Sequence, residues 1–257
     1  MHGIQWGSVT NIGLKRRSNE DSIFLVNSLE LKDEFNRLGI MFAVADGMSG
    51  QPGGKIASKL ACDSLISYYM EKPQNGIGQL PIELLREHLK KVIFEIDMKV
   101  FEHSKTDQTI TDMGTTLSVL VLTNRSAIIA HVGDSRIYRI RKKQLKQLTE
   151  DHTFVQEMIE EGELKPDEVS SHPLRHVLTQ VIGTEERLEK VFSCVETIVP
   201  GDSFLLCTDG LHNMVPDNII LDSLSYNSNP QKKAVRLVDL ALKKGGEDNI
   251  SVIVVQV

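Results

Sequence analysis

Cysteine is scarce in this sequence. The 257 residues include three cysteines, at positions 62, 194 and 207, and none of them belongs to a C-x-x-C pair. An odd number without such a pair argues against a disulfide framework or a zinc knuckle and favours a reducing compartment. The sequence also shows no signal-peptide pattern, and no apolar run approaches the ~20 residues of a membrane helix. We therefore expect a cytoplasmic protein with no membrane partner.

A surplus of basic residues is missing as well. The chain has 29 Lys and Arg residues against 35 Asp and Glu residues, which gives a formal net charge of −6. Nonspecific binding to nucleic acid needs clustered basic side chains, and the one short basic run is 15–17. We expect no nucleic-acid partner.

Several motifs of phosphate chemistry are absent. The chain contains no G-x-x-x-x-G-K-[ST] run, no G-x-G-x-x-G after a strand and no G-x-S-x-G elbow. A glycine-rich run at 50–54 leads into a helical pattern. It is compatible with a weak anion site at a helix start and equally with a flexible turn.

Short apolar runs and helical patterns are what the chain does contain. Runs at 40–45, 117–122, 128–132, 137–140, 204–207 and 250–257 predict strands covered on both faces. The three runs between 117 and 140 are separated by short polar gaps, which predicts an antiparallel meander. Helical spacing of apolar side chains predicts helices over 57–68, 85–100 and 230–244. Thr153 with Gln156 has capping-box spacing for one more, which would end at Gly162.

These elements do not alternate strictly between strand and helix. Such an order favours an α+β fold with sheets and helices in separate layers. No linker rich in Pro, Gly or Ser divides the chain, so we expect a single domain over 1–257. The polar segment 161–178, which carries two prolines, predicts a surface excursion.

Aspartates stand at the ends of four predicted strands, each beside or near glycine: Asp46, Asp134, Asp209 and Asp248. A lone carboxylate at a buried strand end is costly, and several together repel one another unless a cation lies among them. Any one of them alone is equally well explained as Asp-Gly turn chemistry. Together with Glu20 and Asp21, the set predicts a metal site, and oxygen-only ligands suit Mg²⁺ or Mn²⁺.

Nine short motifs follow one another along nearly the whole chain. They are RRSNED at 16–21, ADGM at 45–48, GTT at 114–116, VGDSRIY at 132–138, LTEDH at 148–152, HP at 172–173, LT at 178–179, CTDGL at 207–211 and GEDNISV at 246–252. In this order they resemble the metal-dependent protein phosphatases, the PPM or type 2C Ser/Thr phosphatases, in their bacterial single-domain form. The resemblance implies a four-layer α-β-β-α sandwich of two antiparallel sheets flanked by helix pairs.

The resemblance also implies the metal ligands, namely Asp46, Gly47, Asp209, Asp248, Asp134, Glu20 and Asp21. Asp46 would bridge two ions, and the Gly47 carbonyl would complete one shell. Asp209 and Asp248 would hold the first ion, and Asp134 with Asp209 would form the third site of bacterial members. The other two acids would act near the second ion, partly through water. The cofactors would be two Mn²⁺ or Mg²⁺ ions, with a third in the extra site.

Arg16 and Asp46 are the catalytic residues that the resemblance implies. Arg16 aligns with the phosphate-binding arginine, and Arg17, one step off, ranks second. Two bridged cations lower the pKa of a shared water toward about 7, and the resulting hydroxide attacks phosphorus without a protein nucleophile. The metals and Arg16 offset charge on the phosphoryl oxygens. Segment 161–178 aligns with the variable flap beside the active site.

The loop after Asp46 departs from the family pattern. It reads DGMSGQ at 46–51, whereas bacterial members usually read DGMGGH. Gln51 thus replaces a histidine that could protonate the leaving alkoxide, and glutamine does not titrate near neutral pH. His152 and His172 are alternative donors, although a structural role suits His152 better.

The function predicted from these motifs is metal-dependent hydrolysis of phosphoserine and phosphothreonine on proteins. The partners would be phosphorylated proteins and a cognate Ser/Thr kinase that the phosphatase opposes. Ser49 and Gln51 leave open a pseudophosphatase, a module that binds phosphoproteins without turnover. A hydrolase of small phosphates is a third alternative.

Overall fold

Two five-stranded antiparallel sheets form the centre of the computed structural model, which describes residues 3–25, 39–48, 52–71, 81–106, 113–123, 125–185 and 187–257. The first sheet has the order β1 (Gln5–Asn11), β12 (Ile250–Gln256), β11 (Ser203–Cys207), β8 (Arg136–Arg141) and β9 (Gln144–Gln147). The second has the order β10 (Phe192–Thr197), β7 (Ser126–Val132), β6 (Leu117–Leu122), β3 (Ile40–Ala45) and β2 (Ser22–Leu25). A small ribbon pairs β4 (Gly47–Met48) with β5 (Gly114–Thr115).

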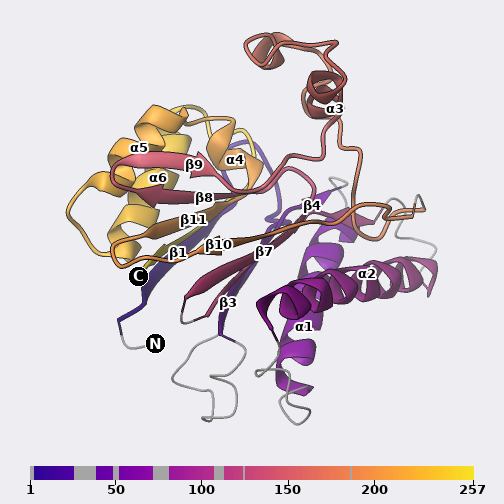
Figure 1. Cartoon of the computed structure of the whole chain (residues 1–257). Coiled ribbons are helices and arrows are strands. Elements are labelled where there is room, and N and C mark those ends of the chain that lie inside the picture. The colour runs from indigo at the N-terminus through magenta and orange to yellow at the C-terminus, as the bar shows by residue number, and fades with distance from the viewer. Residues whose placement is uncertain are drawn as a thin grey trace.

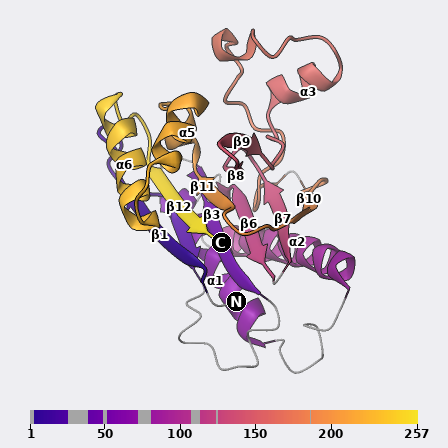
Figure 2. The same ribbon diagram turned by 60° about the vertical axis from the view of Figure 1, so that its left-hand side comes forward.

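Helices cover the outer face of each sheet, as Figures 1 and 2 show. α1 (Pro52–Glu71) and α2 (Ile82–Thr106) pack on the second sheet. α4 (Asp209–His212), α5 (Asp217–Ser225) and α6 (Pro230–Lys243) pack on the first. The buried apolar side chains form three clusters, one between the two sheets and one under each helical layer. The molecule is therefore a four-layer α-β-β-α sandwich, which confirms the predicted α+β class.

Strands that are buried along their whole length lie in the middle of the sandwich. Every residue of β3, β6 and β11 is buried, because a sheet covers one face of each strand and helices cover the other. The runs at 40–45, 117–122 and 204–207 predicted these strands. The side chains of the edge strands β9 and β10 are exposed or only partly buried, and their sequences contain no continuous apolar run.

The predicted meander over 117–140 is only half right. β6 and β7 pair antiparallel, but β8 leaves their sheet and pairs with β11 and β9 in the other. The chain changes sheets at Gly133, whose φ of +102° is a backbone conformation open to glycine. Asp134 lies directly after this turn, so the sheet change brings its carboxylate to the end of both sheets.

The predicted helices are present in the structure. Helical spacing over 57–68 and 85–100 corresponds to α1 and α2, and the last helix is α6. Thr153 caps α3 (Phe154–Glu160), where its side chain accepts a hydrogen bond from the backbone N–H of Gln156. α4 and α5 are short, and the sequence pattern did not predict them.

One segment projects from the sandwich above the ends of the sheets (Figure 1). It contains α3 and the 3₁₀ helix η4 (Val169–Ser171), and an antiparallel bridge between Thr153 and Leu178 closes it. We call residues 153–178 the flap. It encloses the excursion predicted at 161–178 and begins eight residues earlier, because α3 belongs to it.

No helix in the described part of the chain is both long enough and apolar enough to cross a membrane.

Candidate active site

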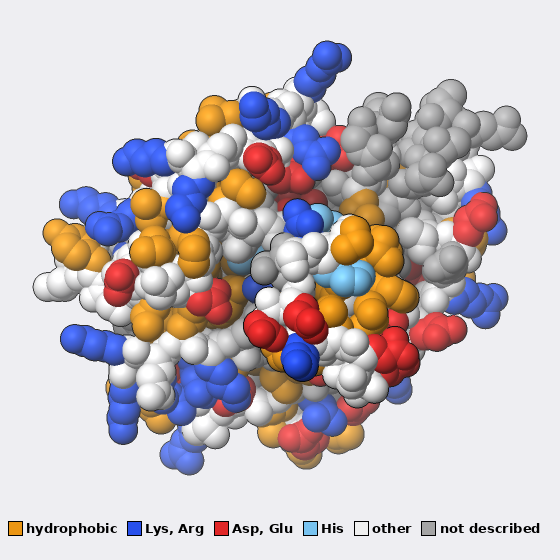
Figure 3. Space-filling model, turned by 90° about the horizontal axis from the view of Figure 1, so that it is seen from above, with side chains coloured by type: hydrophobic (Ala, Val, Ile, Leu, Met, Phe, Trp, Pro, Cys, Tyr) orange, Lys and Arg blue, Asp and Glu red, His pale blue; other side chains and the backbone are white. Residues whose placement is uncertain are grey.

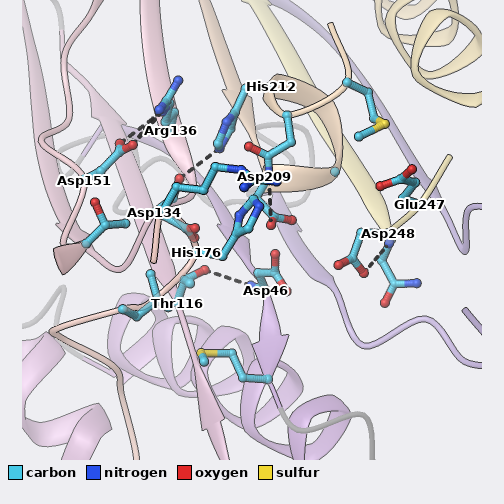
Figure 4. A pocket seen from close by; sticks show the side chains of 18 of the residues that line it. Asp46, Thr116, Asp134, Arg136, Asp151, His176, Asp209, His212, Glu247 and Asp248 are labelled. Carbon is cyan, nitrogen blue, oxygen red and sulfur yellow. Dashed lines mark hydrogen bonds and ion pairs between the residues drawn. The ribbon is translucent and has the colours of Figure 1, made fainter. Parts of the chain in front are cut away.

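Acids from distant parts of the sequence line one cavity of about 1310 Å³ at the end of the two sheets. Asp46 follows β3, Asp134 follows β7, Asp209 follows β11, and Asp248 precedes β12. Figure 4 shows these four side chains around the same space. The prediction that strand-end carboxylates meet is correct, because antiparallel strands from both sheets end or begin at this edge.

Hydrogen bonds from two threonines fix Asp46 at the end of β3. The Thr115 hydroxyl and the Thr116 backbone N–H both donate to the Asp46 carbonyl oxygen, each at 2.9 Å. The Asp46 N–H donates in return to Thr116 Oγ1 at 3.0 Å. With its backbone held on both sides, Asp46 has little freedom except in its side chain, which points into the cavity (Figure 4).

Mutual repulsion and lost hydration characterise the carboxylates at the centre of the cavity. Asp46 and Asp209 open onto the cavity, yet the surrounding protein removes much of their hydration, and this burial is the main cause that raises their pKa values. The pKa of Asp209 rises to about 6, with Asp248 adding to the effect of burial. For Asp46 the neighbouring acids, Asp21 first among them, raise the pKa further.

Asp134 lies beside an arginine that partly compensates its charge. Burial is the main cause that raises its pKa, the Asp209 charge raises it further, and Arg136 lowers it. Arg136 is itself held by Asp151 through Nε–H and Nη2–H bonds, the shortest of them 2.6 Å. On the backbone side, His212 Nε2 lies 3.1 Å from the Asp134 carbonyl oxygen. Groups from β8 and α4 thus surround Asp134.

The N-terminal loop brings Arg16 to the rim of the cavity. Arg16 Nη2 donates to Asp248 Oδ2 at 2.5 Å, so the predicted phosphate-binding arginine pairs with a predicted metal ligand. Asn249 holds this loop in place, because its Nδ2 donates to the carbonyl oxygens of Ile12 and Ser18 at 2.9 and 3.0 Å. Arg17 also lines the cavity and forms no ion pair with a described residue.

The predicted ligands Glu20 and Asp21 differ in placement. Glu20 is buried and lines the cavity, and its backbone N–H donates to Asn249 Oδ1 at 2.8 Å. Asp21 is not among the lining residues. It lies behind Asp209, accepts a bond from Thr208 Oγ1 at 2.9 Å, and has a pKa raised to about 7, chiefly by burial.

Gly47 is placed where no side chain fits. A Cβ atom added there would lie 2.2 Å from the Gly54 carbonyl oxygen and 2.6 Å from that of Glu20. A Cβ added at Gly54 would likewise lie 2.4 Å from Glu20 Oε2. This close approach of backbone segments leaves room only for glycine at position 47, which lines the cavity.

The acid set fits divalent cations, although it does not form a closed ligand shell. No group of three or more His, Cys, Asp or Glu side chains among the described residues lies close enough together to enclose an ion. Yet the Asp46 side chain lies within hydrogen-bonding reach of Asp209, whose Oδ1 is buried and has no donor in the described part of the chain. Two acceptors that face each other need a proton or a cation between them.

Several residues of the cavity were not predicted from the sequence. Thr116, Arg175, His176, His212 and Asn249 line it. Their roles depend on contacts between distant segments, for which the sequence gives no local signal. Neither His152 nor His172 lines the cavity, whereas His176 does. Ser49 and Gln51, which carry the departure from the family pattern, lie outside the described residues.

Comparison with known proteins agrees with this geometry. A model of the protein phosphatase 2C family matches residues 19–235. The serine/threonine phosphatase stp of Listeria welshimeri is 35% identical over 213 residues, 83% of this chain and 82% of that protein. The protein phosphatase PhpP of Streptococcus pneumoniae is 34% identical over 248 residues, 96% of this chain and 95% of that protein.

Solved structures with the same fold extend the comparison. The serine/threonine phosphatase of S. agalactiae has a TM-score of 0.87 at 30% identity and covers 99% of both chains. The catalytic domain of the serine threonine protein phosphatase PstP in complex with 2 manganese ions has a TM-score of 0.79 at 28% identity, over 98% of this chain and 97% of that chain.

Proposed function

Because this chain belongs to the protein phosphatase 2C family, it is a divalent-metal-dependent serine/threonine protein phosphatase, and we propose that the acids of the cavity form its metal site. The observation that carries the proposal is the convergence of Asp46, Asp134, Asp209 and Asp248 on one cavity. We propose one catalytic domain over 1–257, with the flap at 153–178.

In this proposal the acids divide the ligand positions among themselves. Asp46 would bridge two ions, with the Gly47 carbonyl beside it, and Asp209 and Asp248 would hold the first ion. The manganese-bound PstP structure supports two ions of this kind, and Mn²⁺ or Mg²⁺ suits an oxygen-only set. Asp134 is within electrostatic reach of Asp209, which supports a third site between them.

The second ion would draw on the two acids of the N-terminal segment. Glu20 lines the cavity and can face an ion there. Asp21 is buried behind Asp209, so it would act indirectly, through water or through the charge it places beside Asp46. Both residues would thus act on the second ion, Glu20 from within the cavity and Asp21 from outside it.

The chain's own groups would bind and orient the phosphorylated side chain. Arg16 at the rim would bind phosphoryl oxygens, a role for which a planar guanidinium is suited. The cations, when bound, would supply Lewis acidity that lowers the pKa of water toward about 7. Asp46, whose backbone is held by Thr115 and Thr116, would hold the cations in place at the end of β3.

Phosphorylated proteins are the substrates of this enzyme class, and we propose that a Ser/Thr kinase supplies them in the same cell. Three free cysteines, at positions 62, 194 and 207, support a reducing compartment, which we propose is the cytoplasm. Deleting the gene and quantifying phosphoserine and phosphothreonine across the proteome would identify the substrates.

Hydrolysis of p-nitrophenyl phosphate and of a phosphothreonine peptide, each with Mn²⁺ and with chelator, tests the proposed function. We expect turnover of both with Mn²⁺ and none with chelator. No Mn²⁺-dependent turnover of either compound would contradict the proposal. Peptide binding without hydrolysis would favour a pseudophosphatase, and hydrolysis of only small esters would favour a small-phosphate hydrolase.

A further inference from the structure

The flap is an arm attached to the body mainly at its base. Apart from the bridge between Thr153 and Leu178, the Phe154 N–H donates to the Val177 carbonyl oxygen at 2.9 Å and the Thr179 N–H donates to that of His152 at 3.0 Å. Beyond this base, α3 and η4 stand above the ends of the sheets (Figures 1 and 2), and residues of both line the cavity. The flap therefore forms one wall of the space through which a substrate must pass.

Much of that wall is apolar, although Thr153, Gln156, Arg175 and His176 of the flap also line the cavity. The flap residues that line the cavity include Val155, Ile159, Pro166, Val169 and Leu178. Val155 is buried, but the other four keep exposed surface toward the solvent-filled space. Figure 3, which looks down on the flap, shows hydrophobic side chains gathered beside histidine on this face. Apolar surface next to a highly polar catalytic centre needs an explanation.

The N-terminal loop gives the cavity a different chemistry, because it presents Lys15, Arg16 and Arg17. Cationic groups there suit the phosphoryl group and the peptide next to it. The cavity thus combines charged groups with the apolar side chains of α3, η4 and Leu178, so a phosphopeptide with an apolar neighbour can contact both.

The size of the cavity shows that more than a phosphorylated side chain is accommodated. A cavity of about 1310 Å³ exceeds the ≈ 300–1,000 Å³ of typical small-ligand pockets. The acids account for one end only. The remaining space, bounded by the flap, is continuous with the catalytic end and has room for the residues that flank a phosphoserine or phosphothreonine.

From these observations we propose that the wall of Val155, Ile159, Val169 and Leu178 binds a bulky apolar side chain next to the phosphorylated residue of the substrate. The enzyme then selects phosphopeptides with an apolar neighbour over those with a small or polar one. This inference rests on the proposed function, because it names the substrate class of the same site. The gain comes from apolar surface of the peptide removed from water against the flap.

Two series of phosphothreonine peptides test the proposal. Each series places Leu or the similarly shaped Asn directly before or directly after the phosphothreonine, and kcat/KM is measured with Mn²⁺. We expect kcat/KM to be about tenfold higher for Leu than for Asn on at least one side, chiefly because KM is lower. A tenfold preference is the low end of the discrimination that an apolar pocket achieves. Equal rates for Leu and Asn on both sides would overturn the inference.

Variants of α3 connect that preference to the wall. Ile159→Asn should reduce the Leu preference to below about twofold and leave p-nitrophenyl phosphate hydrolysis unchanged, because that ester has no flanking residues. Met158→Asn is the matched control, since Met158 is on the same helix and does not line the cavity. Ile159→Val keeps an apolar side chain and should retain the Leu preference. It tests the wall independently in case the Ile159→Asn variant does not fold.

The results separate the two levels of the argument. If the unaltered enzyme does not hydrolyse p-nitrophenyl phosphate, the proposed function itself is contradicted. Normal hydrolysis of that ester, with a Leu preference that Ile159→Asn leaves intact or that Met158→Asn removes equally, would overturn only the role of the flap wall.

Discussion

At the residue scale, the contact between Arg16 and Asp248 joins two functions. Arg16 is predicted to bind phosphate and Asp248 is predicted to bind a metal ion. The two side chains form an ion pair, with 49% of the Arg16 side chain and 30% of the Asp248 side chain exposed. Asp248 cannot offer the same oxygen to Arg16 and to a cation with equal strength. If Asp248 holds the first metal ion as proposed, Arg16 would compete with that ion for Asp248 while no phosphate is bound.

Arg16→Ala should bind Mn²⁺ more tightly, by about two- to fivefold, since a partly exposed ion pair contributes only ~0.2–1 kcal/mol. Calorimetric titration of the chelator-treated, phosphate-free protein measures the affinity. Arg17→Ala is the control, because it removes the same charge from the same cavity without breaking an ion pair between described residues. An equal change in both variants would mean that net charge, and not the pair, is responsible.

At the element scale, the passage from β7 to β8 is the step that brings Asp134 to the cavity. Gly133 turns there with φ +102°, and a Cβ atom would lie 2.5 Å from Thr116 Cγ2. Gly133→Ala should therefore combine backbone strain of about 1–2 kcal/mol with overpacking of about 1–3 kcal/mol. A melting temperature lower by about 4–20 °C is the expected result.

Gly162→Ala provides the comparison for that measurement. Gly162 also has a positive φ, +77°, but nothing lies within 4 Å of an added Cβ. The Gly162→Ala variant should lose only the stability that corresponds to backbone strain, about 1–2 kcal/mol. If both variants melt at the same temperature, the contact with Thr116 is not what makes glycine necessary at 133.

The same elements show what the sequence could reveal. β3, β6 and β11 are apolar on both faces because layers cover them on both sides, so their runs are visible without a structure. The sheet that β8 joins was not predictable, since local hydrophobicity does not identify a distant partner strand. The strand-end acids were predictable from their glycine neighbours, whereas Thr116 and Asn249 act only through contacts made on folding.

At the scale of the whole molecule, two buried histidines connect the flap to the sheets. The rings of His131 and His152 lie 5.2 Å apart, and His152 Nδ1 accepts a bond from the Gly133 N–H at 3.2 Å. Burial lowers the pKa of His131 well below its usual value, and it lowers that of His152 to about 4. Both side chains are thus neutral in the folded protein at neutral pH.

The contribution of these two histidines to stability should consequently fall as the pH falls below about 6.5, whereas the acids whose pKa values are raised by burial change stability in the opposite direction. The unfolded chain then binds protons that the folded chain cannot, and each histidine costs about 1.4 kcal/mol per pH unit until its folded pKa, about 4 for His152, is reached. His152→Asn, whose amide oxygen can accept the same bond, should reduce the slope of unfolding free energy against pH between 6.5 and 4.5. An unchanged slope in denaturant titrations would contradict this role for His152.

The central claim is that Asp46 and its neighbouring acids hold the divalent ions of a phosphatase. The most direct test is calorimetric titration with Mn²⁺ of the chelator-treated wild-type protein and of the chelator-treated Asp46→Asn variant. The wild-type protein should bind at least two ions. Asp46→Asn should lose both of the bridged ions yet melt no lower than the wild type in chelator, because it removes a carboxylate that repels its neighbours. Binding of Mn²⁺ by folded Asp46→Asn with the stoichiometry and affinity of the wild type would contradict the claim.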